Sequence, residues 1–202
     1  MDFQEVLRRR RLVRHFSDEP VAPEVLERLL AAALRAPSAG FSQGYALVVL
    51  DTDEERARFW ATQGDPSVPV DDALAATLEA MKRAPVLVVA LGSRDIYLDR
   101  YAESDKGWVD RDEARWPVPY WYVDTGFLCL LMLLAAVDEG LGALLFGIPP
   151  SDIPALRAEF GIPESFVPVG CVAIGHEASD APKRDLRSRR RLASEIVHRG
   201  GW

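Results

Sequence analysis

The sequence predicts one folded domain of the α/β or α+β class. At 202 residues, the chain is long enough for one well-buried domain and short for two. Four short apolar runs have the length and composition of buried strands: 45–51, 86–91, 143–148 and 167–175. One helical pattern precedes the first run, at 24–35, and others lie between the runs, at 53–62, 71–83 and 151–160. Pro168 indicates that the last strand is either an edge strand or one that begins there.

The segment from Asp124 to Gly140 is predicted to be a helix in the middle of the protein. Every residue from Phe127 to Val137 is apolar, so this helix has no face suited to water. These 11 residues are too few to cross a bilayer, which needs about 20. We therefore expect a core or subunit-contact helix, and no membrane span.

The net charge of −7 conceals two basic ends. Eleven of the 24 basic residues lie there: Arg8, Arg9, Arg10, Arg11, Arg14, Lys183, Arg184, Arg187, Arg189, Arg190 and Arg191. The rest of the chain is strongly acidic, which argues against a broad nucleic-acid or membrane-binding surface. Two short basic clusters suit a small, localised anion better.

Cysteine and histidine usage gives no sign of a metal site. Cys129 and Cys171 lie inside apolar runs without ligand spacing, so they are expected to be reduced core residues. The three histidines are far apart in the sequence, and no Ser-His-Asp arrangement can be assembled. With no signal-peptide pattern at the N-terminus, we expect a cytoplasmic protein.

Arginines follow an apolar stripe at the start of the chain. Phe3, Val6 and Leu7 have helical spacing, and the next positions of the stripe are Arg10 or Arg11 and then Arg14. Guanidinium groups that face the core need carboxylates or a bound phosphate as partners. A solvated basic face is the alternative, and for Arg8 and Arg9 it is the preferred one.

Two further segments are candidate binding regions. The loop 36–44 is rich in small residues, which lets a cofactor approach the backbone, although an ordinary connecting loop has the same composition. Aromatic residues crowd the segment 95–122, which suggests a cap or pocket wall. Aromatics that pack the segment onto the body are the commoner explanation for any one of them.

Several of these segments resemble the flavin-dependent nitroreductase family. The resemblance rests on Arg-Arg-Leu-Val-Arg-His-Phe at 10–16, Pro-Val at 20–21 and Ala-Pro-Ser-Ala-Gly-Phe-Ser-Gln at 36–43. It continues through the apolar helix and its strand to Arg-Ser-Arg-Arg-Arg-Leu at 187–192 and Glu-Ile-Val-His at 195–198. It therefore covers most of the chain.

The resemblance implies a single domain over residues 1–202, with a central mixed β-sheet flanked by helices in an intertwined homodimer. It implies FMN at the dimer interface and NAD(P)H as reductant. The FMN phosphate and ribityl end would be bound near Leu12 by Arg10, Arg11 and Arg14, joined by Arg187 and Arg189. Four residues of the partner chain would border the flavin ring: Pro37, Ser38, Ala39 and Phe41. Backbone groups of Phe146 and Gly147 would lie near flavin N5.

Departures from the family pattern bear on the substrate. Leu12 replaces a common serine, and Phe41 replaces a common asparagine. Gly44-Tyr45 stands where Pro-Trp is usual. We expect FMN binding to survive, because backbone amides and arginines carry most of it. The expected substrate wall is aromatic: Phe41, Tyr45, Trp108, Trp116 and Tyr120.

The predicted function is an FMN-dependent oxidoreductase that passes electrons from NAD(P)H to a planar acceptor such as a nitroaromatic or quinone. No nucleophile-base pair is needed for flavin chemistry. Two alternatives stay open: a biosynthetic dehydrogenase or flavin-cleaving member of the same family, and a non-enzymatic flavin-binding protein. No nucleic-acid, membrane or metal partner is expected.

Overall fold

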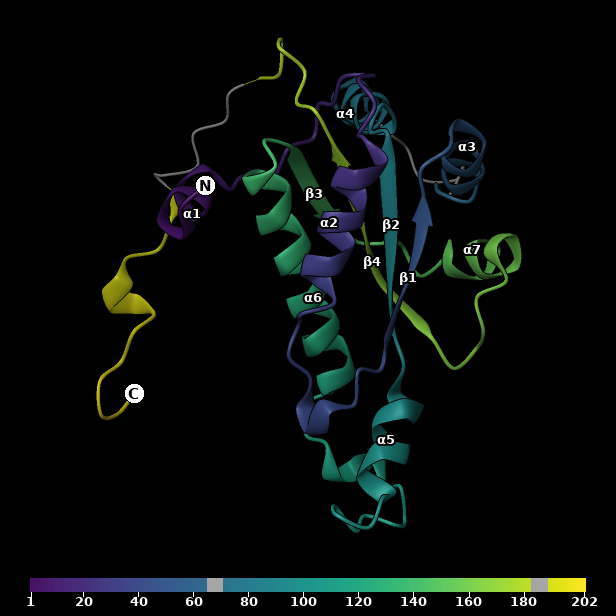
Figure 1. The fold of residues 1–202 in the computed structure, drawn as a ribbon, viewed down its shortest axis with the longest axis vertical. Coiled ribbons are helices and arrows are strands. Elements are labelled where there is room, and N and C mark those ends of the chain that lie inside the picture. Colours follow the sequence, from purple (N-terminus) through teal and green to yellow (C-terminus); the bar gives the residue numbers. More distant parts are fainter. Residues whose placement is uncertain (65–70, 183–188) are drawn as a thin grey trace.

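The computed structural model describes residues 1–64, 71–182 and 189–202 (Figure 1). Its centre is a four-stranded sheet in the order β1-β2-β4-β3. The strands are β1 (Tyr45–Leu50), β2 (Val86–Gly92), β3 (Gly142–Phe146) and β4 (Val167–Gly175). All three strand pairings are antiparallel. The expected α+β fold is confirmed, and among the described residues the parallel component of the sheet is one isolated bridge between Leu12 and Ala143.

Helices cover both faces of this sheet (Figure 1). The α-helices of the described residues are α1 (Phe3–Arg9), α2 (Pro23–Ala33), α3 (Asp53–Ala61), α4 (Asp72–Lys82), α5 (Arg94–Ala102), α6 (Tyr120–Asp138) and α7 (Ile153–Phe160), of which α1 and α5 lie beyond the sheet. Short 3₁₀ turns lie at Ala39–Phe41, Glu113–Arg115 and Ala193–Glu195. Helices α2 and α6 pack on one face and α3 and α7 lie on the other.

The burial of strand β2 on both faces explains why its sequence is continuously apolar. Every residue of the strand is buried. Val86, Val88 and Ala90 pack under α2 and α6, while the alternate residues Leu87 and Val89 join the core on the α3 and α7 side. A strand covered on both faces has no position for a polar residue, so alternation disappears from the sequence.

Helix α6 has 19 residues and begins at Tyr120, before the apolar run. It is long and apolar enough to span a membrane by composition, but half of that stretch is buried within this chain. Its inner side packs on α2 and the sheet, as expected for a core helix. Its other side exposes Phe127 and Leu130, with 43% and 46% of their surface accessible. A single chain therefore leaves an apolar face of α6 uncovered.

Two local expectations are revised. Helix α1 ends at Arg9, so Arg10 and Arg14 do not continue its stripe, and Phe3 is exposed rather than inward-facing. Pro168 is the second residue of β4, which is an interior strand. The strand-start explanation for this proline is therefore right and the edge-strand explanation is wrong. The sheet accommodates it beside a register shift between Ala90 and Leu91 in β2.

The described C-terminal residues, 189–202, extend away from the sheet (Figure 1). All of them are exposed, including the apolar Leu192, Ile196 and Val197. Exposed apolar side chains on an extended terminal segment are costly in water. Within the described residues, neither this segment nor the outer face of α6 has a covering surface.

We predict that Gly142→Ala lowers the free energy of unfolding by about 1–3 kcal/mol. A Cβ atom at this buried position would lie 2.7 Å from Val13 Cγ2, and the stiff valine has little room to move. Gly126→Ala is the matched control, because nothing lies within 4 Å of its added Cβ and alanine favours the interior of α6. Urea denaturation of both variants measures the difference. Equal stability of the two would contradict the tight contact.

Candidate functional site

The basic segment 10–14 runs along the free edge of β3. The Val13 N–H donates to the Ala143 carbonyl at 3.0 Å, which fixes the segment against the strand. Beyond it, the Ser17 N–H donates to the His176 carbonyl at 2.9 Å and the Ala178 N–H donates to the His15 carbonyl at 3.0 Å. Backbone hydrogen bonds therefore hold this part of the chain against β3 and against the residues that follow β4 (Val167–Gly175).

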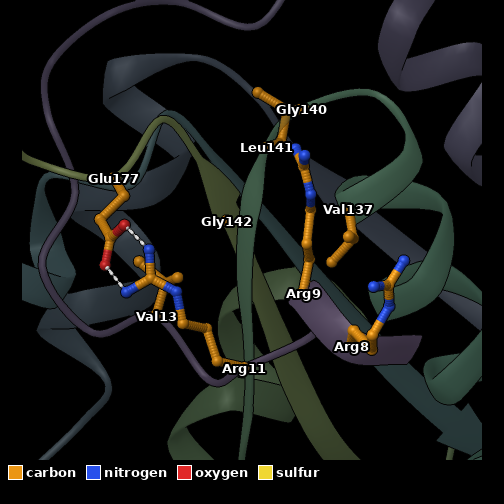
Figure 2. Close-up of a pocket in the computed structure, with 9 residues that line it drawn as sticks. All are labelled: Arg8, Arg9, Arg11, Val13, Val137, Gly140, Leu141, Gly142 and Glu177. Carbon is orange, nitrogen blue, oxygen red and sulfur yellow. Dashed lines mark hydrogen bonds and ion pairs between the residues drawn. The ribbon is translucent and has the colours of Figure 1, made fainter. Parts of the chain in front are cut away.

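Arg11 forms a bidentate ion pair with Glu177 (Figure 2). Figure 2 shows the pair beside Val13, at one side of a cleft of about 400 Å³. Arg9 points toward Gly140 and Leu141 in the same view. The planar guanidinium is matched by a carboxylate of the same chain, so Arg11 already has an anionic partner.

Arg10 and Arg14 are in a different position. Val13 is buried whereas Leu12 is exposed, which indicates an extended segment in which alternate residues face opposite sides. Arg10, Leu12 and Arg14 then share the side away from Arg11. Both arginines are half-buried, and neither side chain has a hydrogen bond or ion pair within residues 1–64, 71–182 and 189–202.

This lack of partners distinguishes Arg10 and Arg14 from the other half-buried arginines. Arg56 donates to the Asp51 and Pro85 carbonyls, Arg100 to Gly40 and Asp105, and Arg157 to three backbone carbonyls. A half-buried guanidinium without such bonds is unfavourable by the usual desolvation argument. The two arginines are therefore suited to an anion from outside the described part of the chain.

The free edge of β3 continues beyond Ala143, toward Leu145 and Phe146. The Ala143 carbonyl faces outward to Val13, so by alternation the backbone groups of Leu145 also face outward. The Phe146 carbonyl points instead toward Gly170 in β4, and the Phe146 ring stacks on Trp60 at 5.7 Å. Gly147 follows the strand, is exposed and has nothing within 4 Å of an added Cβ.

The small-residue loop forms the second half of the candidate site. Phe41 is 74% exposed and has φ of 55°, and Gln43 has φ of 50°. Left-handed backbone is unusual for residues other than glycine and often occurs at functional positions. The loop thus presents an apolar ring to solvent in a conformation that costs energy.

Asp124 fixes this loop from beneath. Its Oδ2 accepts the Ala39 N–H at 2.8 Å and the Tyr97 hydroxyl at 2.6 Å, and only 2% of the residue is exposed. Burial, assisted by Asp124, raises the pKa of Tyr97, so its hydroxyl keeps its proton at neutral pH. In the sequence, Asp124 is only the first residue of the expected helix, because both of its bonds join residues that are distant along the chain.

The aromatic residues of the segment 95–122, called the aromatic excursion from here on, pack against one another. Trp116 is its hub, with ring centroids 4.5 to 6.1 Å from five others: Tyr97, Tyr101, Trp108, Tyr120 and Trp121. Tyr45 packs instead against the core under α2 and α6. A cleft of about 450 Å³ lies beside Trp121 and Tyr122, and none of the five predicted substrate residues lines it. The structure thus groups Trp108, Trp116 and Tyr120, whereas Tyr45 packs on the core.

The two halves of the candidate site lie at opposite ends of α6 (Figure 1). Asp124 and the loop mark one end, and Asp138, paired with the N-terminal amine, marks the other. At 1.5 Å per residue, these aspartates are about 21 Å apart along the helix. One chain therefore does not bring Pro37, Ser38, Ala39 and Phe41 to its own arginines. Arg187 lies outside the described residues, and Arg189 is exposed in the C-terminal segment.

Neither a metal centre nor a reactive thiol is present in the part of the chain that the structure describes. No group of three or more potential ligands is close enough to hold a metal. Burial raises the pKa of Cys129 to about 11 and that of Cys171 well above its usual value. Both thiols therefore stay protonated at neutral pH and do not act as nucleophiles.

Relatives match most of the chain. A protein from Methanothermobacter thermautotrophicus, provisionally named an NADH dehydrogenase/NAD(P)H nitroreductase, is 27% identical over 92% of this chain and 83% of its own length. An NADPH-dependent oxidoreductase from Staphylococcus aureus is 22% identical over 83% of this chain and 62% of its own.

Solved structures share the fold. A nitroreductase family protein from Clostridium difficile 630 superposes with a TM-score of 0.73 over the whole of both chains, at 21% identity. The nitroreductase CinD from Lactococcus lactis, solved with nicotinic acid, gives 0.72 over 95% of this chain and 100% of its own, at 22% identity. An FMN-dependent nitroreductase from C. difficile R20291 gives 0.69 over 98% of each chain, at 19% identity.

The family model for the nitroreductase family matches residues 7–176. This range holds the segment 10–14, the loop 36–44, the whole sheet and α6, which are the parts from which the candidate site is built. The chain belongs to the nitroreductase family of oxidoreductases.

Proposed function

We propose that this protein is an FMN-dependent oxidoreductase that takes hydride from NADH or NADPH and passes electrons to a planar acceptor such as a nitroaromatic or quinone. The observation that carries the proposal is the pair of half-buried arginines, Arg10 and Arg14, which lack partners in the described chain. A phosphate monoester supplies the charge that such a pair needs. Arg11 contributes indirectly, because its bond to Glu177 fixes the segment.

Other features of the candidate site suit the part of FMN beyond its phosphate. The open edge of β3 offers the outward-facing backbone of Leu145, and exposed Gly147 lets a flat ring approach without a side chain in the way. Leu12 gives an apolar contact in place of a hydroxyl. When bound, FMN supplies the hydride and electron chemistry, while the protein binds it, orients it and excludes water. The predicted backbone contribution of Phe146 passes to its neighbours, because its carbonyl faces β4.

Assembly as a homodimer would complete the site. The loop and the arginines of one chain are held apart by α6, and a two-fold axis across the exposed face of α6 would set one end of the helix beside the other end of its partner. Phe127 and Leu130 would be covered at the same time. The exposed apolar residues of 189–202 would also find a surface there.

The reductant and the acceptor are proposed from the relatives and from Phe41. Relatives carry the names NAD(P)H nitroreductase and NADPH-dependent oxidoreductase, and one structural neighbour was solved in complex with nicotinic acid. An exposed phenyl ring beside the flavin of the partner would favour flat aromatic acceptors, since stacking contributes about 0.5–1.5 kcal/mol per pair.

We predict that Arg14→Ala weakens FMN binding roughly tenfold to a hundredfold, because a charge-assisted phosphate contact contributes about 1.5–3 kcal/mol. Arg8→Ala is the control: Arg8 is exposed and already paired with Glu5. Flavin fluorescence titration of the apoprotein measures both. A wild-type protein that does not bind FMN would defeat the proposed function.

We predict that Leu130→Asp converts the dimer to a monomer and releases FMN. The change places a charge on the uncovered face of α6, where the side chain is 46% exposed and the fold of one chain should tolerate it. Leu74→Asp on α4, at a leucine that is 48% exposed, is the matched control. Sedimentation velocity, followed by absorbance at a flavin wavelength, measures both the oligomeric state and the bound FMN. A wild-type monomer that retains FMN would contradict the dimer.

A further inference from the structure

We propose that Tyr97 and Asp124 are positioning residues that hold the loop 38–43 so that Phe41 meets the acceptor in the partner's site. The inference rests on the proposed function, because it assigns a task to Phe41 at the flavin. The new element is that the buried hydrogen bond between Tyr97 and Asp124, beneath the loop, sets the acceptor selectivity. Neither residue would contact the acceptor itself.

The contacts converge on a single carboxylate oxygen. Asp124 Oδ2 accepts from the Ala39 N–H at 2.8 Å and from the Tyr97 hydroxyl at 2.6 Å. Tyr97 is fully buried and Asp124 nearly so, which strengthens both bonds and makes their loss costly. The carboxylate thereby joins α6, α5 and the loop.

Packing prevents the loop from moving on this anchor. An added Cβ at Gly40 would lie 2.6 Å from the Tyr101 ring, and one at Gly44 would lie 2.6 Å from the Tyr97 ring. Arg100 donates to the Gly40 carbonyl at 3.0 Å from the same helix, α5. The backbone on both sides of Phe41 is thus pressed against two tyrosines. Such over-determination is what a residue with left-handed φ needs in order to persist.

This arrangement gives the aromatic excursion a different task from the one its composition suggested. Tyr101 lies against the loop at Gly40, and the rings of Tyr101, Trp108 and Trp116 contact one another. Their rings support Tyr97, which is in edge contact with Trp116 at 6.0 Å. The excursion therefore acts on the acceptor through the loop rather than as a wall.

Tyr97→Phe tests the proposal, with Tyr101→Phe as the matched control. Both changes remove one hydroxyl from the same cluster and keep the ring, but the Tyr101 hydroxyl has no hydrogen bond within the described residues. Hydrogen–deuterium exchange of the full-length protein, with and without FMN, follows the amides of 38–43. We expect exchange roughly tenfold to a hundredfold faster in Tyr97→Phe and unchanged in the control. Equal exchange in the two variants would overturn the proposal.

Asp124→Asn provides a second measurement should Tyr97→Phe fail to fold. The amide keeps an acceptor of the same shape but loses the charge, so exchange should rise by a smaller factor in the same segment. No rise in this variant would also overturn the proposal.

A double-mutant cycle tests whether Tyr97 acts through Phe41. The measured quantity is the ratio of kcat/KM for a simple naphthoquinone to that for a nitrobenzoate. Tyr97→Phe should change this ratio in the wild-type background and by less than about twofold in the Phe41→Asn background. An equal change in both backgrounds would overturn the proposed route. If neither acceptor is reduced, the proposed function fails, while hydrogen exchange still decides whether the loop is held in this way.

Discussion

The length of α6 constrains everything else in the candidate site. The helix has 19 residues, packs one side on α2 and the sheet, and carries a different half of the site at each end. Because a helix is rigid over this distance, no local adjustment can bring Phe41 to Arg10 and Arg14 of the same chain. In the proposed dimer, a second copy related by a two-fold axis would satisfy the geometry and would cover Phe127 and Leu130 with one contact. Cofactor binding and assembly would then be a single requirement.

Ion pairs within the described residues distinguish two groups of arginines near the N-terminus. Arg11 is neutralised by Glu177, and the exposed Arg8 and Arg9 share Glu5. Arg10 and Arg14 lack this neutralisation within the described residues although they are half-buried. Among the described residues, Arg10 and Arg14 are therefore the half-buried arginines that remain available to an anion.

The strands were predictable from sequence because each is a short apolar run, and β2 is buried on both faces. The start of α6 was not, since Tyr120 to Val123 are aromatic or β-branched and carry no cap signal. In the site, the arginine motif and the small-residue loop were visible as local patterns. The bonds of Glu177 and Asp124 were not, because each joins residues that are distant in the sequence. Position in the sequence alone cannot distinguish Arg11 from Arg10. The side that each one faces is inferred from the burial of Val13 and the exposure of Leu12.

Burial of Asp124 explains how a rigid scaffold can hold a strained loop without adding bulk to it. A buried carboxylate is unfavourable alone, and here a hydroxyl and a backbone amide from two elements compensate it. The loop itself contributes small residues at Gly40 and Gly44, so that tyrosine rings can lie against its backbone. The residues beneath the loop thus fix its conformation, and Phe41 stays exposed on its outer surface. Under the proposed function, a substitution at position 41 would then alter the acceptor without disturbing the anchor beneath the loop.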